Sequence, residues 1–143
     1  MCAYFFVFGE EIVVSVVTVE IAPGELIDKI TILEIKLERI KDEAKLANIR
    51  AEWKTLTKSR DAAFENLDKL IKLTEDLKAI NEELWIIEDD IRDCERAKDF
   101  SDAFVQLARA VYITNDRRAD GKRAINELLG SRLIEEKSYA DYT

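Results

Sequence analysis

The chain has 143 residues, 48% hydrophobic and 36% charged, with a formal net charge of −8, which predicts one folded domain rather than a disordered chain. The negative charge argues against a general nucleic-acid or anionic-membrane binder, because both need a cationic face. The absence of histidine removes the commonest general base and metal ligand, and with it any triad or zinc site built on imidazole.

Residues 1–22 form a first segment that differs in composition from the rest. It is rich in aromatic and β-branched residues, which predicts a short N-terminal β-strand or hairpin. Glu10 and Glu11 interrupt its apolar run and no basic segment precedes it, so it is not typical of a signal peptide or a membrane span. An isolated hairpin is marginally stable, so we expect this element to pack on helices or pair with a second chain.

Residues 23–143 predict a single helical domain that begins with two helices. Pro23-Gly24-Glu25 suits the first turn of a helix. Its apolar residues spread beyond one stripe, so we expect cover on more than one side. A break at 41–42, with Asp42 as N-cap, leads to a second helix. A change of heptad phase favours another break at 64–67. The apolar positions of the two helices are Leu26, Ile30, Leu33, Leu37, Ile40, Leu46, Ile49, Trp53 and Leu56.

The longest pattern in the chain is an apolar seam with alternating spacings of three and four. It comprises Leu70, Leu73, Leu77, Ile80, Leu84, Ile87, Ile91 and Cys94. Such a seam indicates a third helix, to about Ala97, that packs lengthwise on other helices. Asp99 or Ser101 caps a fourth helix, and Gly130 ends it. We therefore predict an all-α helical bundle with a long antiparallel coiled-coil-like hairpin, plus the short N-terminal β element.

The fourth helix has a fault in its apolar stripe. At helical spacing from Leu107 and Val111 the next positions are polar before Ile125 restores the pattern, and they are Asn115, Arg118 and Lys122. Polar groups on an inward face need partners, and the acidic third helix offers them. Two interpretations stay open: a salt-bridge network that fixes helix register, or a pocket between the third and fourth helices for a small anionic or polyhydroxylated ligand.

Arg118 is the sharpest test of either interpretation. A guanidinium keeps its charge, so burial requires carboxylate or carbonyl partners. We expect Arg118 to be at least half buried and bridged to the acidic run 88–90, or to Glu135 or Glu136 of the tail.

Two enzymatic alternatives remain open from the residues alone. Glu82, Asp89 and Asp93 could share one helix face and hold Mg²⁺, as in all-helical nucleotide pyrophosphohydrolases. The glutamate pairs usual on a second helix are not evident, and a solvated charged face is the simpler explanation. The spacing of Asp28, Lys29 and Arg39 on the first helix suggests a chorismate-mutase-like enzyme.

Four blocks in this order together resemble an uncharacterised family of small bacterial and phage proteins, classed as a domain of unknown function. They are GELIDKITILEIKLERIKD (24–42), INEELWIIEDDIRDCE (80–95), FVQLARAVYITNDRRA (104–119) and INELLGSRLIEEKSYADY (125–142). The resemblance covers about residue 18 to the C-terminus, and Gly121 departs from a usually larger residue. It implies a shared site or interface without a known reaction, and an association with glycosyltransferase or surface-polysaccharide genes.

The resemblance and the stripe together give the candidate ligand-binding residues. They are Glu88, Asp89, Arg92, Arg109, Tyr112, Asn115, Asp116, Arg118, Glu135, Lys137 and Tyr139. The family motif also covers Glu136 and Ser138. We predict no catalytic residue among them, no metal site and no resident cofactor, with Mg²⁺ only under the pyrophosphohydrolase alternative.

We therefore predict a non-enzymatic binding or assembly module, accessory to carbohydrate or cell-surface biosynthesis. Its partner would be a small anionic or sugar-like ligand or another protein, and neither nucleic acid nor membrane. Two cysteines are too few for a disulfide scaffold, and Cys94 lies on the apolar seam, which favours a reduced thiol in a cytoplasmic protein. The first helix and the β element both need cover, so we expect a homodimer.

Overall fold

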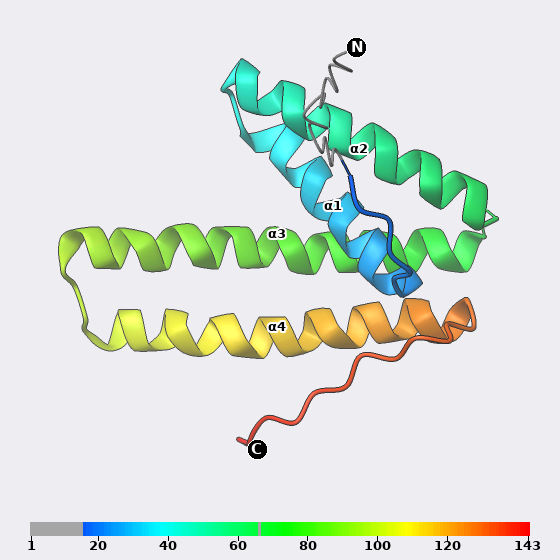
Figure 1. Ribbon diagram of the computed structural model, residues 1–143. Helices are drawn as coiled ribbons and strands as arrows, with labels where there is room; N and C mark the ends of the chain where they lie inside the picture. The colour runs from blue at the N-terminus through cyan, green and yellow to red at the C-terminus, as the bar shows by residue number, and fades with distance from the viewer. Residues whose placement is uncertain (1–15, 66) are drawn as a thin grey trace, which may run out of the picture.

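The computed structural model describes residues 16–65 and 67–143, and its regular secondary structure over these residues is entirely helical (Figure 1). The helices are α1 (Pro23–Arg39), α2 (Glu43–Ala63), α3 (Asp68–Ala97) and α4 (Asp102–Leu128). The all-α prediction is confirmed. The N-terminal β element of 1–22 is not supported: most of it lies outside the described residues, and residues 16–22 contain no regular secondary structure.

The helix boundaries follow signals that are local in the sequence. Pro23 stands at the first turn of α1, and the Asp42 side chain accepts a hydrogen bond from the Lys45 N–H at 2.9 Å to cap α2. Lys98 adopts the left-handed conformation (φ 54°) after α3, and Gly130 does so (φ 64°) after α4. The breaks predicted at 41–42 and 64–67 both lie between helices, as expected.

The helices form two antiparallel pairs that cross (Figure 1). Helices α3 and α4 lie side by side as one hairpin, and α1 with α2 forms the other. Helix α1 crosses over both α3 and α4, whereas α2 packs on α1. The antiparallel hairpin is therefore present, and its coiled-coil character stays a prediction. None of the helices in the described part of the chain is both long and apolar enough to cross a bilayer.

The core lies where α1 meets the α3–α4 hairpin. Ile27 of α1, Leu70 and Leu77 of α3, and Ile125 of α4 are buried together. The predicted seam of α3 faces inward, and Leu84 in its middle is buried. This packing fixes the crossing of α1 on the hairpin and so decides which polar residues can meet.

Gly24 allows α1 to approach α4 closely at this crossing. Its backbone N–H donates to Asn126 Oδ1 at 2.7 Å. A Cβ at this position would lie 2.4 Å from the backbone carbonyl oxygen of Lys122, well inside van der Waals contact. A larger residue would therefore force α1 away from α4.

Candidate functional site: a polar network and a groove on helix α4

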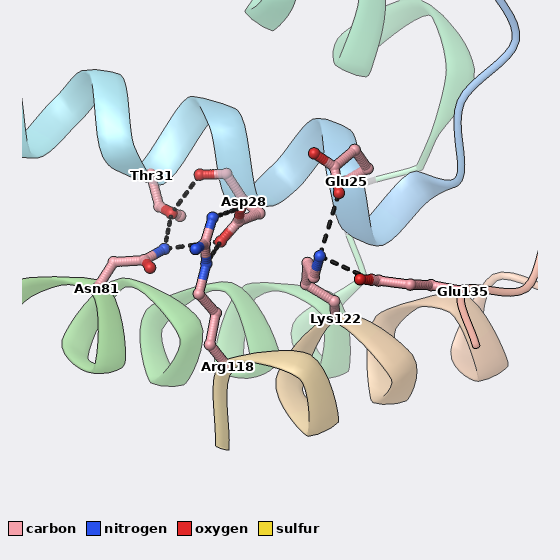
Figure 2. A network of polar contacts seen from close by, with 7 residues as sticks. All are labelled: Glu25, Asp28, Thr31, Asn81, Arg118, Lys122 and Glu135. Atoms are coloured by element: carbon pink, nitrogen blue, oxygen red, sulfur yellow. Dashed lines mark hydrogen bonds and ion pairs between the residues drawn. The ribbon is translucent and has the colours of Figure 1, made fainter. Parts of the chain in front are cut away.

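An ion pair between the partly exposed Arg118 and the fully buried Asp28 joins α4 to α1 (Figure 2). Arg118 donates from Nε and Nη2 to the two carboxylate oxygens of Asp28, at 2.9 and 2.5 Å. Asn81 of α3 donates from Nδ2 to Asp28 at 2.9 Å and to the Thr31 hydroxyl at 3.0 Å. The bonds to Asp28 raise the pKa of Arg118, although burial by itself lowers it. The carboxylate of Asp28 is thus fully enclosed by donors.

Helix α1 holds Asp28 in place through a second inward face. Gly24, Asp28, Thr31 and Ile35 recur at helical spacing, and all four are buried. Their stripe faces the hairpin, and the Thr31 hydroxyl donates to its own helix at the Asp28 carbonyl, 2.8 Å away. This face explains why α1 is covered on more than one side, as predicted.

A second cation on α4, Lys122, connects α1 to the C-terminal segment 131–143. Its ammonium lies 3.1 Å from Glu25 and 2.7 Å from Glu135 (Figure 2), and 11% of the side chain is exposed. Burial lowers the pKa of Lys122, but hydrogen bonds to Glu135 and Glu25 outweigh it and raise the value. The same bond lowers the pKa of Glu135. Lys122 therefore ties the C-terminal segment to the core.

The expected partners of Arg118 were wrong. Its side chain is 29% exposed, so the prediction that it is at least half buried is confirmed. The carboxylate that pairs with it, however, is that of Asp28 and not one from the run 88–90 or the tail. Between α3 and α4 the described residues hold one ion pair, Arg117 with Glu83 at 2.7 Å, and both side chains are about half exposed. Helix α1 supplies the partner because it crosses α4 where the apolar stripe of α4 is interrupted, which places Asp28 beside Arg118.

A large groove lies between α4 and the C-terminal segment, which runs back beside that helix (Figure 1). Its volume is about 860 Å³. The residues that line it are Val111, Tyr112, Asn115, Asp116, Arg118, Ala119, Lys122, Glu135, Lys137, Tyr139, Ala140, Asp141 and Tyr142. The groove is therefore built by α4 on one side and by an extended chain on the other.

Two contacts between residues 135–142 and α4 explain the space beneath the C-terminal segment. One is Glu135 on Lys122; the other is the Tyr142 hydroxyl, which donates to Asp116 at 2.6 Å. Asp116 and Lys122 lie about 9 Å apart along α4, whereas an extended chain from Glu135 to Tyr142 reaches up to about 23 Å. The segment is longer than the helix it spans, so its middle stands off from α4.

Aromatic rings lie at the end of the groove next to Asp116, which we call the outer end. Tyr112 and Tyr142 meet edge to face, with centroids 5.1 Å apart and an interplanar angle of 65°. The bond to Asp116 raises the pKa of Tyr142. Tyr139 lines the same groove and leaves 84% of its surface exposed.

The structure brings together most of the candidate residues, but between α4 and the C-terminal segment rather than between α3 and α4. Those that line the groove are Tyr112, Asn115, Asp116, Arg118, Glu135, Lys137 and Tyr139. Arg92 pairs with Glu88 along α3, Arg109 donates to Gln106 along α4, and Asp89 is exposed. None of these four lines the groove, which does not lie between α3 and α4.

The candidate residues omit three groove residues of α4 and three of the tail. They are Val111, Ala119, Lys122, Ala140, Asp141 and Tyr142. Asp141 and Tyr142 stand in the last block of the resemblance, and Lys122 stands in the polar fault of α4, so both signals were present. What was missing was the return path of the tail, because no periodic pattern marks an extended segment.

The enzymatic alternatives find few matching features. No group of three or more His, Cys, Asp or Glu side chains that could hold a metal ion occurs within residues 16–65 and 67–143. Of the three residues that suggested a chorismate-mutase-like enzyme, Asp28 is buried against Arg118, while Lys29 and Arg39 are exposed. The groove itself is lined by a single arginine.

Comparison with known proteins finds one family. The profile of a family of unknown function (DUF6165) matches residues 17–142. No curated protein and no solved structure gives a significant match.

Proposed function

The chain belongs to the family of unknown function DUF6165, and on this premise we propose that it is a non-enzymatic binding module. Its ligand groove is the space between α4 and the C-terminal segment. The proposed ligand is small and sugar-like, and the proposed setting is an accessory role in carbohydrate or cell-surface biosynthesis in the cytoplasm.

One observation carries this proposal. Residues from two distant blocks of the sequence, 112–118 and 135–139, meet around a single groove of about 860 Å³. Pockets of this size suit small molecules, and a few convergent polar groups give them specificity. Tyrosine rings, the Asn115 amide and the Asp116 carboxylate offer flat apolar faces beside hydrogen-bonding groups. A hydroxylated ring presents the same combination of surfaces.

The interactions of three ionisable groups of the groove favour binding over catalysis. Arg118 is committed to Asp28, Lys122 is shared by Glu25 and Glu135, and Asp116 accepts from Tyr142. These groups hold α1 and the C-terminal segment in place, so proton transfer would require breaking the structure around them.

A groove-filling variant tests the proposal without removing any polar group. Ala119→Trp places an indole in the groove from the α4 side, whereas Ala79→Trp makes the same change at an exposed position of α3 outside it. Thermal shift against neutral saccharides, amino sugars and sugar nucleotides should find a stabilising compound whose effect Ala119→Trp abolishes and Ala79→Trp retains. Equal effects of both variants, or no stabilising compound, would contradict the proposal.

We also propose that the module is a homodimer through the end of the hairpin that lies beyond α1. Ile86, Phe100 and Val105 there are 50%, 54% and 46% exposed. Two-fold pairing of such hairpins would cover these side chains. Sedimentation equilibrium should give twice the chain mass, and Val105→Glu should shift the protein to a monomer with its helix content unchanged. A monomer at micromolar concentration for the unaltered chain would defeat this proposal.

A further inference from the structure

The cations of the groove all lie at the end next to Lys122 and Glu135, which we call the inner end. Carboxylates already pair with them there. Arg118 is paired with Asp28, and Lys122 lies between Glu25 and Glu135. Lys137 lies close enough to Glu135 to help lower the pKa of that carboxyl. An anionic ligand at this end would have to displace Glu135 from a buried ammonium and leave the displaced carboxylate unpaired.

The outer end of the groove has the opposite character. Asp116 and Asp141 both line it, and no lysine or arginine of residues 16–65 and 67–143 lies within salt-bridge distance of either. Their recorded partners are hydroxyl and backbone donors: Tyr142 bonds to Asp116, and Thr143 bonds to Asp141. Two carboxylates without a cation therefore face the same space as the tyrosines.

Tyrosine rings are the other constituent of this end. Tyr112 and Tyr142 stand edge to face at 5.1 Å, and Tyr139 adds a third, largely exposed ring. The faces of aromatic rings attract cations through their quadrupole, and aromatic rings beside carboxylates are a recurring site for ammonium groups. The same rings offer nothing comparable to an anion.

From this polarity we infer that the outer end of the groove, between Tyr112, Asp116 and Tyr142, binds an organic cation, an amine or quaternary ammonium group. The inference rests on the proposed function, since it names the charge that the groove's ligand carries. A hydroxylated amine would place its ammonium among the rings and its hydroxyl groups toward Asn115 and the inner end. A neutral polyol would leave the two carboxylates without a cation, and a phosphate would be repelled by them.

Three small probes of different charge test the inference on the full chain. Choline, myo-inositol and inorganic phosphate are titrated separately at constant ionic strength, and binding is followed by ¹⁵N–¹H correlation spectra. Choline should shift resonances of 111–119 and 139–143. Asp116→Asn should weaken this binding by about tenfold. The matched control is Asp120→Asn, which removes the same charge from an exposed α4 position outside the groove lining and should change it little.

Variants of Tyr142 separate the ring from its hydroxyl tether. Tyr142→Phe keeps the ring and releases Asp116, so choline binding should persist, whereas Tyr142→Leu should weaken it. Shifts that spread over the acidic surface and respond equally to both aspartate variants would overturn the inference. Groove binding of inositol or phosphate without choline would also overturn it while leaving the proposed binding function intact. If none of the three probes shifts the groove, the inference is wrong, and the Ala119→Trp and Ala79→Trp pair decides the proposed function separately.

Discussion

Arg118 and Asp28, 90 residues apart in the chain, form a two-point ion pair at 2.9 and 2.5 Å that joins α4 to α1. The Asp28 side chain is 1% exposed, and Asn81 donates a further bond to it. A carboxylate so enclosed cannot recover water contacts if its cation is removed. The pair therefore has unequal members: Arg118 still reaches the groove, whereas Asp28 depends wholly on its partners.

The first prediction concerns removal of the cation. Arg118→Met should lower the free energy of unfolding by about 3–5 kcal/mol, because it leaves a buried carboxylate without its counter-charge. Urea denaturation measures this. Arg117→Met is the matched control: its pair with Glu83 is half exposed, so its cost should stay below about 1 kcal/mol.

The double variant Asp28→Leu with Arg118→Met tests the same point from the other side. Removing both charges should restore most of the lost stability, since an apolar pair of similar volume often replaces a buried ion pair without penalty. If the single variant Arg118→Met proves as stable as the unaltered chain, Asp28 reaches water and the description of the network is wrong.

The second prediction contrasts two glycines. Gly24→Ala should destabilise by about 1–3 kcal/mol, because its Cβ would meet the Lys122 carbonyl at 2.4 Å and backbone cannot yield cheaply. Gly121→Ala should cost less than Gly24→Ala, because its Cβ would lie 3.3 Å from a side-chain methyl group of Leu77 rather than against backbone, and alanine favours a helix by about 1 kcal/mol over glycine. Thermal unfolding of both variants checks this, and the reverse ranking would contradict the crossing geometry.

The third prediction tests the seam of α3. Leu84→Ala should cost about 2–5 kcal/mol, because Leu84 is 7% exposed and its loss leaves a cavity. Ile71→Ala on the same helix should cost less, since this side chain is 39% exposed. Chemical denaturation of the pair gives the comparison. Equal costs for the two would mean that the seam does not face the core.

The fourth prediction is a pH dependence at the root of the C-terminal segment. The Lys122 ammonium lowers the pKa of Glu135 below 4.5 in the folded protein. Its contribution to stability is therefore complete above about pH 4.5 and is lost as the pH falls through the lowered value. Glu135→Gln should be less stable than the unaltered chain at pH 7, and the difference should vanish in acid.

Hydrogen exchange of 131–143 and thermal unfolding, both followed against pH, measure this difference. Glu136→Gln is the control, because Glu136 is exposed and forms no ion pair with the described residues. A difference that persists unchanged below the lowered pKa would show that Glu135 acts through packing rather than charge.

Much of the fold was readable because its signals are short-range. The cap at Asp42, Pro23 in the first turn of α1 and the left-handed Gly130 each act within one turn of helix. The seam of α3 repeats often enough that its inward face could be assigned without knowing its neighbour. The polar residues that interrupt the apolar stripe of α4 likewise indicated that Arg118 and Lys122 need partners.

By itself, then, the sequence determined the helices, their breaks and the need for buried countercharges on α4, because backbone hydrogen bonding and hydrophobic periodicity are local. Only the tertiary structure decided which carboxylates answer that need. The chain holds 30 acidic residues, and the choice of Asp28 and Glu25 depends on where α1 crosses the hairpin, a geometry set by packing at Gly24 and Ile27. The same holds for the groove, because an extended tail carries no periodicity, and its place beside α4 is decided by Lys122 and Asp116.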